Sequence, residues 1–313
     1  MDESTSGRLD QVADVILRRA DNHALAGRLG FRLSRVTAAT GLGYQRYSPS
    51  LSVVAAGRKR TIIGDDDRAW GRERFIITPV DLPVVAAVVE AEEERGFLAA
   101  RWQLSPILVA EVAAAMPGNG QPPAGMDRLG TWTQPLADAF ARLISLLDEP
   151  EHMAFLGPLV AREVIVRLLQ TDQAPRVLAA VADSDAVVPR AVALLTDRLD
   201  EPWTVDALAA EVRTSQPTLF RRFKDATSMT PMQYLKRLRL GEARHRMVVF
   251  GDSAAQAASA VGYRSASHFS RDYRHLYGET PAADAVRTRL QLRTWQEGRL
   301  PAAGLDGLTL GGT

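Results

Sequence analysis

Hydrophobic and polar residues change their spacing along the chain, and each spacing predicts a different kind of element. Apolar residues recur at helical intervals over 9–29, as Leu9, Val12 and Val15 show. Over 31–104 the pattern becomes short β-prone runs, among them LSVVAAG and RFIITPV, which Gly, Pro and Asp clusters interrupt. Short strands at regular intervals predict a small β-barrel or sandwich in this part of the chain.

Helical spacing returns after these strands. Residues 105–116 are expected to form a helix with Ser105 as its N-cap and Pro106 in its first turn. The following GNGQPPAG predicts a loop, and two further helices are expected at 134–148 and 152–170. Each carries an apolar stripe, which packs inside one chain or forms a seam between two copies. The stripes are Leu136, Phe140, Leu143, Ile144 and Leu147 in the first helix, and Leu159, Val160, Val164, Val166 and Leu168 in the second.

Residues 204–231, TVDALAAEVRTSQPTLFRRFKDATSMTP, predict a helix, a tight turn and a second helix. Thr204 and Ser215 are placed to cap the two helices, and Leu219 and Phe223, four residues apart, anchor the second helix to a core. We expect the remaining face to meet DNA, because recognition helices present their N-terminal residues to base edges in the major groove. That face comprises Gln216, Pro217, Thr218, Phe220, Arg221 and Lys224.

A second copy of this pattern follows at 252–281, DSAAQAASAVGYRSASHFSRDYRHLYGETP, with one extra residue in its turn. Gly262 stands where a positive φ is expected, and Ser265 is the expected cap of the second helix. An Arg-rich helix at 231–249 joins the copies and sets the spacing of the two recognition helices, which suits major grooves one turn (~34 Å) apart. The exposed face of this second recognition helix comprises Ala266, Ser267, Ser270, Arg271 and Arg274.

A single helix-turn-helix pattern is a weak signal, because such patterns arise by chance and Arg-rich helices are often solvated faces. Here the duplication, the caps and the spacing all favour DNA binding over a chance match. The charge distribution agrees too: residues 200–293 carry 15 Lys and Arg against 10 Asp and Glu, whereas 1–199 carry 22 against 25. A basic C-terminal third fits a nucleic-acid-binding module attached to another domain.

The C-terminal third resembles the AraC/XylS family of bacterial transcription regulators over about 186–290. The segments that carry the resemblance are LAAEV and TLFRRFK within 208–224, TPMQYLKRLRLGEAR at 230–244, and AASAVGYRSASHFSRDYRHLYGETP at 257–281, which matches the family's own signature. Three residues depart from the family pattern. Arg213 and Ser228 stand where Gly is often found, and Asp284 replaces an aromatic residue after the final Pro.

The N-terminal part is similar to the N-terminal domain of one AraC subgroup, through YSPSLSVVAAGRKRTIIGDD, FIITPVDLPVVAAVVEA and LAARWQLSPILVAEV. This resemblance implies a small cupin-like β-barrel followed by helices, serving as a regulatory and dimerisation domain. The expected fold class is therefore multidomain α+β, with an all-α domain of two helix-turn-helix units after the barrel. We expect the N-terminal domain at 1–185, the DNA-binding domain at 186–295 and a flexible tail at 296–313, with 171–185 as a candidate linker.

Enzymatic and metal-dependent functions are disfavoured. The chain has no Cys, which excludes thiol catalysis and suits a reducing compartment, and none of its five His lies in the barrel region 31–116. We therefore expect no catalytic residue, cofactor or metal. The charged N-terminus predicts no signal peptide, and no apolar run approaches the ~20 residues that span a bilayer, so we expect a cytoplasmic protein with no membrane contact.

The expected function is sequence-specific DNA binding that responds to a small molecule in the N-terminal domain, with a homodimer and RNA polymerase as further expected partners. Arg58-Lys59-Arg60 after Gly57 predicts a hairpin turn that could anchor an anion. An alternative is a constitutive architectural DNA-binding protein whose barrel binds no ligand; it predicts weak sequence preference. The candidate ligand-binding residues are Tyr44, Tyr47, Arg58, Thr78, Arg101 and Trp102.

Overall fold

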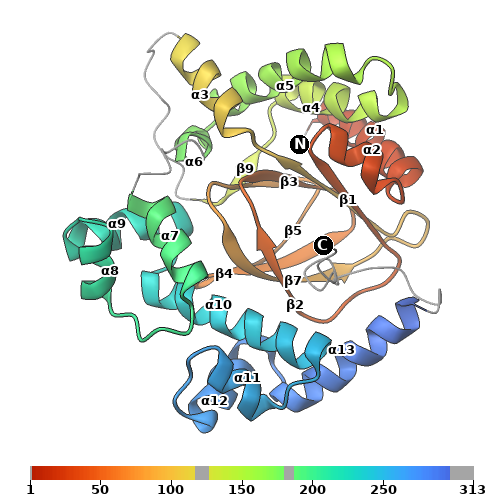
Figure 1. Ribbon diagram of the computed structural model, residues 1–313. Helices are drawn as coiled ribbons and strands as arrows, with labels where there is room; N and C mark the ends of the chain where they lie inside the picture. The colour runs from red at the N-terminus through yellow and green to blue at the C-terminus, as the bar shows by residue number, and fades with distance from the viewer. Residues whose placement is uncertain (1, 117–126, 180–186, 297–313) are drawn as a thin grey trace.

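The computed structural model describes residues 2–116, 127–179 and 187–296. A β-barrel lies at the centre, with the N-terminal helices against one side and the C-terminal helices along the other (Figure 1). The predicted loop at 118–125 lies outside the described residues, and so does the predicted tail apart from Gln296, which ends the last helix. Within the described ranges, no helix is both long and apolar enough to cross a membrane.

Two antiparallel sheets form the barrel. The five-stranded sheet has the order β1-β8-β3-β6-β9, and the four-stranded sheet has the order β2-β7-β4-β5. The strands are β1 (Phe31–Val36), β2 (Gly43–Tyr47), β3 (Ser50–Ala56), β4 (Arg58–Ile63), β5 (Asp66–Gly71), β6 (Arg74–Thr78), β7 (Leu82–Glu90), β8 (Phe97–Gln103) and β9 (Leu129–Thr131).

Two sequence predictions for the barrel need correction. Arg58, Lys59 and Arg60 do not form a hairpin turn: they open β4, and the chain passes from one sheet to the other at Gly57, whose φ is 75°. The strand β9 lies beyond the predicted limit of the barrel at 104. It was missed because LGT is too short to show alternation, and its pairing with β6 defines it instead.

The five-stranded sheet uses its two faces differently. Side chains such as Leu51, Val53 and Trp102 belong to the core beneath the N-terminal helices, whereas the alternate residues face the barrel interior. At one end of that interior, residues from both sheets form a compact apolar cluster that includes Val54, Trp70 and Phe97. The opposite end is polar.

The N-terminal helices confirm most of the predicted elements. They are α1 (Glu3–Arg19), α2 (His23–Arg28), α3 (Pro106–Ala115), α4 (Gln134–Ser145), η1 (Leu146–Asp148), α5 (Met153–Leu169) and α6 (Ala174–Ala179). Ser105 caps α3 as expected, and the whole predicted stripe of α4 is buried. On α5 the predicted stripe is wrong at Leu159, which is 65% exposed, because the helix turns that edge away from the core. The candidate linker contains α6, which buries Ala174 and Val177.

The C-terminal helices are α7 (Val187–Asp197), α8 (Val205–Glu211), α9 (Gln216–Thr227), α10 (Pro231–His245), the π-helical η2 (Arg246–Phe250), α11 (Ala254–Ala260), α12 (Ala266–Tyr277) and α13 (Pro281–Gln296). The first unit, α8–α9, and the second unit, α11–α12, are the two predicted helix-turn-helix motifs. The expected caps Thr204, Ser215 and Ser265 all accept a hydrogen bond from a backbone N–H in the following turn.

The outer face of the four-stranded sheet packs against α10. Leu82 and Val84 of β7, which lie on the interior face of the strand, belong to an apolar cluster that also includes Tyr234 and Leu238 of α10 and the core of the first unit. On the same strand, Val85 belongs to a second cluster with the core of the second unit. The helix approaches closely, because a Cβ at Gly241 would lie 2.2 Å from the Tyr44 ring. The barrel therefore serves as the support on which both units are mounted (Figure 1).

Candidate nucleic-acid interface

The recognition helix α9 of the first unit turns its apolar side inward. Leu219 and Phe223 are fully buried, as expected from their spacing. The opposite side faces solvent, and the amide of Gln216 donates to Asp206 on α8. Of the predicted DNA-facing residues, Thr218 is half-buried and the others are exposed: Gln216, Pro217, Phe220, Arg221 and Lys224.

The recognition helix α12 of the second unit repeats this arrangement. Phe269 and Tyr273 fill the positions of Leu219 and Phe223 and are also fully buried. Its outward face is polar and carries two Arg side chains without a carboxylate partner among the described residues, Arg271 and Arg274. Ala266 and Ser267 are exposed as well, and Ser270 is half-buried.

The residues that depart from the family pattern occupy special backbone positions. Arg213 in the turn of the first unit has a φ of 55°, and Ser228 at the end of α9 has a φ of 57°. The corresponding Gly262 of the second unit has a φ of 82°, which confirms the expected positive value. Positive φ is strained for residues with a side chain, so the first unit holds two residues in a conformation that favours glycine.

The Arg residues of α10 hold the protein together instead of forming an open basic surface. Arg237 donates to the carbonyl oxygen of Gly64 in the β4–β5 turn at 2.9 Å. Arg239 donates to the carbonyl oxygens of Leu199 and Glu201 at 2.7 and 2.6 Å. Burial lowers the pKa of both guanidinium groups. The expected contribution of α10 to DNA binding is therefore its length and rigidity.

Arg244 of α10 forms a buried ion pair with Asp284 of α13. Its Nε lies 2.7 Å from Asp284 Oδ2, and the two side chains are only 4% and 0% exposed. Tyr273 on α12 donates its hydroxyl to the same carboxylate at 2.6 Å. Burial by itself would raise the pKa of Asp284, but hydrogen bonds and charge from Arg244 outweigh it and lower that pKa. From the sequence, Asp284 was identified only as a departure from the family pattern. Its buried ion pair with Arg244 was not predicted.

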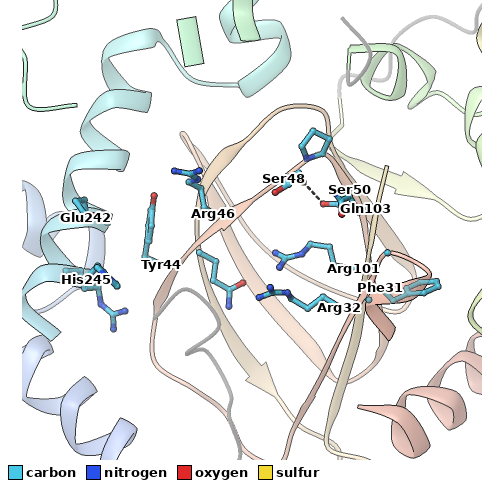
Figure 2. Close-up of a pocket in the computed structure, with 16 residues that line it drawn as sticks. Phe31, Arg32, Tyr44, Arg46, Ser48, Ser50, Arg101, Gln103, Glu242 and His245 are labelled. Carbon is cyan, nitrogen blue, oxygen red and sulfur yellow. Dashed lines mark hydrogen bonds between the residues drawn. The ribbon is translucent and has the colours of Figure 1, made fainter. Parts of the chain in front are cut away.

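A cavity of about 570 Å³ lies where the polar end of the barrel meets α10. Figure 2 shows Arg32 and Arg101 reaching from the five-stranded sheet towards the strand that carries Tyr44 and Arg46, with α10 beyond it. Of the predicted ligand-binding residues, Tyr44 and Arg101 line this cavity. Arg32 and Arg46 were missed, although the alternation in FRLSRV places Arg32 on the interior face of β1.

The other predicted ligand-binding residues lie around the cavity or away from it. The ring of Tyr47 lies beneath Arg101, 4.3 Å from its guanidinium carbon. Thr78 is buried on the interior side of β6. Arg58 instead lies 3.6 Å from Glu73 in an ion pair, and Trp102 faces the helices, where its indole donates to Leu29. The described residues contain no cluster of three or more His, Asp or Glu side chains that could hold a metal ion.

Comparison with known proteins agrees with both halves of the structure. A family model described as the AraC-type transcriptional regulator N-terminus matches residues 29–176, and one described as a helix-turn-helix domain matches residues 208–285. The transcriptional regulator ArgR of Pseudomonas aeruginosa is 32% identical over 150 residues, covering 47% of this chain and 45% of ArgR. The transcriptional activator RhaS of Escherichia fergusonii is 31% identical over 141 residues, covering 45% of this chain and 51% of RhaS.

The chain thus spans about half the length of the curated relatives it matches, and those relatives are transcriptional regulators rather than enzymes. Among solved structures, wild-type ToxT from Vibrio cholerae with a bound unsaturated fatty acid superposes with a TM-score of 0.51. The alignment covers 82% of this chain and 93% of ToxT at 9% sequence identity. At that identity the likeness shows a shared fold alone, in which a β-rich domain is followed by helices.

Proposed function

We propose that this chain, which belongs to the AraC/XylS family of transcriptional regulators, binds an asymmetric DNA site through both of its helix-turn-helix units and responds to a small molecule. The observation that carries the proposal is the pair of polar recognition helices, α9 and α12, mounted on the single helix α10. One rigid connection between two readers supports simultaneous entry into successive major grooves. Because DNA is the partner, the proposed location is the cytoplasm.

In this proposal, affinity and sequence choice come from different side chains. Exposed cations such as Lys224 and Arg274 contact phosphates and make binding sensitive to salt. Gln216 and Arg221 on α9, with Ser267 and Arg271 on α12, contact base edges, where Arg bonds guanine and Gln bonds adenine in pairs of hydrogen bonds.

Site selection from random DNA with the purified full chain tests the proposal. We expect a steep preference for one asymmetric site with two half-sites about one DNA turn apart. Arg271→Ala should relax the preference at one or two base pairs by about 1–3 kcal/mol. Lys224→Ala is the matched comparison and should weaken binding to all sequences alike. Weak preference throughout would favour the constitutive architectural protein instead.

The proposed effector site is the cavity between the barrel and α10. Its walls come from the barrel strands and from Gly241, Glu242, Arg244 and His245 of the helix that carries both units. A molecule that contacts both walls changes how α10 sits on the barrel, and so changes the DNA affinity. The fatty acid in the ToxT structure supports ligand binding by this fold, although it does not identify the ligand of this chain.

We further propose that the chain acts as a homodimer and contacts RNA polymerase when bound to DNA. Three large apolar side chains on neighbouring helices support the dimer, because Ile107 of α3 and Phe155 and Leu159 of α5 are 74%, 78% and 65% exposed. Light scattering of the full chain tests this, with Phe155→Ser expected to shift the mass to that of a monomer. An unchanged mass for wild type and variant would remove α5 from the interface.

A further inference from the structure

The guanidinium group of Arg128 is buried without a partner among the described residues. Arg128 lies directly before β9 and is 4% exposed, and its Nε, Nη1 and Nη2 are all shielded from solvent without a hydrogen bond. Other Arg residues leave one buried nitrogen unused but donate from another, as Arg72 and Arg237 do. A buried charge without a partner is costly, and buried charges in proteins are normally paired.

Arg128 remains charged in this position. Burial lowers the pKa of its guanidinium to about 10, and the charges of Arg176 and Arg68 act in the same direction while that of Asp66 opposes them. A pKa of about 10 lies far above neutral pH. The group therefore carries its positive charge at pH 7, where a counter-ion would stabilise it.

Arg128 lies at the junction of the two sheets. β5 is the edge strand of the four-stranded sheet, and β9 is an edge strand of the five-stranded sheet. Arg68 of β5 joins them, because it donates to Asp66 at the start of its own strand and to Asp127 close to β9, both at 2.5 Å. Both carboxylates are therefore paired with Arg68, and neither accepts a hydrogen bond from Arg128.

Helix α6 adds a third side to this junction (Figure 1). Gln173, directly before the helix, and Arg176 within it both donate to the backbone carbonyl oxygen of Asp127 at 3.1 Å. Gln173 is itself fully buried. The described groups around Arg128 thus tie β5, β9 and α6 together but offer its guanidinium no acceptor, so the missing counter-charge points to a bound anion.

We infer that Arg128 binds a small oxyanion, of the size of formate or inorganic phosphate, at the junction of β5, β9 and α6. The planar guanidinium offers two parallel N–H groups, which match two oxygen atoms of a carboxylate or a phosphate. Because its nitrogens are shielded from solvent, the ligand is enclosed, which favours a small ion. Arg128 does not line the cavity beside α10, so this is a second site that does not depend on the proposed effector.

The site lies on the connection between the barrel and the first unit. β5 begins directly after Gly64 and Asp65, where Arg237 of α10 donates to the carbonyl oxygen of Gly64 and Gln233 donates to the carboxylate of Asp65. α6 is the last described helix before α7, which begins the C-terminal helices. A bound oxyanion therefore holds together two segments that lead from the N-terminal domain towards the recognition helices.

Thermal unfolding of the full chain tests the oxyanion site. Formate and inorganic phosphate are the two probes, which separate a carboxylate from a phosphate, and the larger gluconate ion keeps the ionic strength constant. We expect at least one probe to raise the midpoint temperature by about 3 °C for each tenfold increase above its dissociation constant. No rise with either probe at millimolar concentration overturns the inference, and an equal rise with chloride overturns the oxyanion class.

Matched variants locate the effect at Arg128, because phosphate also stabilises proteins through its exclusion from their surface. Arg128→Met keeps an apolar stem and removes the buried charge, so without a probe it should be at least as stable as the wild type. It should lose most of the response to the effective probe. Arg142→Met is the control, because Arg142 is exposed and pairs with Glu163 away from the site, and it should respond as the wild type does. Equal responses of the wild type and Arg128→Met overturn the site.

Hydrogen exchange of the wild type gives a second measurement, which does not depend on the folding of a variant. The effective probe should slow exchange in β5, β9 and α6, the three elements that meet at Arg128, while exchange in α12 stays unchanged. Uniform slowing along the whole chain would show general stabilisation by the salt and would overturn the inference.

Discussion

The two helix-turn-helix units share one design, but they are stabilised in different ways. In the second unit the two positions that need a positive φ are both glycine, Gly262 at 82° and Gly278 at 78°. In the first unit the same positions hold Arg213 at 55° and Ser228 at 57°. The second unit thus matches its sequence to its backbone, whereas the first holds two residues that its backbone disfavours.

Each unit is supported by a different neighbour. The barrel turn between β4 and β5 presses on the end of the first unit, where Met229 is fully buried and Ser228 lies against Gly64. The second unit is tied to α10 and α13 through the ion pair of Arg244 with Asp284. The first unit therefore depends on the barrel for its conformation, while the second, which also packs on β7, is further closed by an ion pair between the helices α10 and α13. Four substitutions test this difference.

Asp284→Ala should have the largest effect, because it leaves the charge of Arg244 buried without its partner. We expect a loss of about 3–5 kcal/mol in the free energy of unfolding. Hydrogen exchange should show the loss in α12 and α13 before α8 and α9. Glu279→Ala is the control, because Glu279 also pairs with an Arg but at the surface, where the expected change is below about 1 kcal/mol. Equal losses in both variants would contradict the special role of the buried pair.

The carboxylate of Asp284 should also make the stability of the protein depend on pH in the acid range. The pKa of Asp284 is lower in the folded protein than in the unfolded chain, so its contribution is present above an unfolded pKa of about 3.9. That contribution is lost as the pH falls below this value through the folded pKa. The wild type should therefore lose stability more steeply below about pH 4 than Asp284→Ala does, as measured by urea unfolding across pH.

Gly262→Ala should come next. A Cβ at this position would lie 2.3 Å from the carbonyl oxygen of Asp200, and the φ of 82° disfavours any side chain. Strain and overlap together should cost about 3 kcal/mol in urea unfolding. Gly278→Ala is the matched comparison, because nothing lies within 4 Å of its Cβ position and only the strained φ remains. Its cost should be about 1 kcal/mol, and equal costs would mean that contact with Asp200 is unimportant.

The sequence predicted most of the architecture because the deciding signals are local. Caps such as Ser215 and Ser265 and the burial of Leu219 and Phe223 follow from neighbouring residues alone. What could not be predicted depends on pairing between distant segments. Arg244 reads as one more exposed cation of an Arg-rich helix until α13 brings Asp284 to it, forty residues further along the chain.

The lining of the cavity also depends on pairing between distant segments, so it could be predicted only in part. Tyr44 and Arg101 could be proposed from their chemistry, but only the register of β1 with β8 places Arg32 beside Arg101. The apolar run PVVAAVV in β7 would have predicted that a second layer covers this strand, but the sequence analysis did not use it. A strand without polar alternation is buried on both faces, and β7 is buried between the barrel interior and α10.

Gly64→Ala tests the dependence of the first unit on the barrel. The added Cβ would lie 2.6 Å from the carbonyl oxygen of Ser228, in a backbone whose φ is 61°. We expect the turn to move away, with a loss of about 2 kcal/mol and faster hydrogen exchange at the C-terminal end of α9. Exchange in α12 should stay unchanged. Equal acceleration in both recognition helices would contradict separate support for the two units.

Arg213→Gly should have the smallest effect and the opposite sign. Glycine relieves the strained φ, which costs about 1–2 kcal/mol for other residues, but it also makes the unfolded chain more flexible by roughly 1 kcal/mol. The net gain in stability should be about 0–1 kcal/mol, whereas Arg222→Gly, nearby in α9, should lose about 1 kcal/mol. If Arg213→Gly also weakens binding to all DNA sequences alike, the strain is retained because the Arg side chain contacts a phosphate. A stabilised variant with unchanged DNA affinity would instead show that the strain at Arg213 serves no contact with DNA.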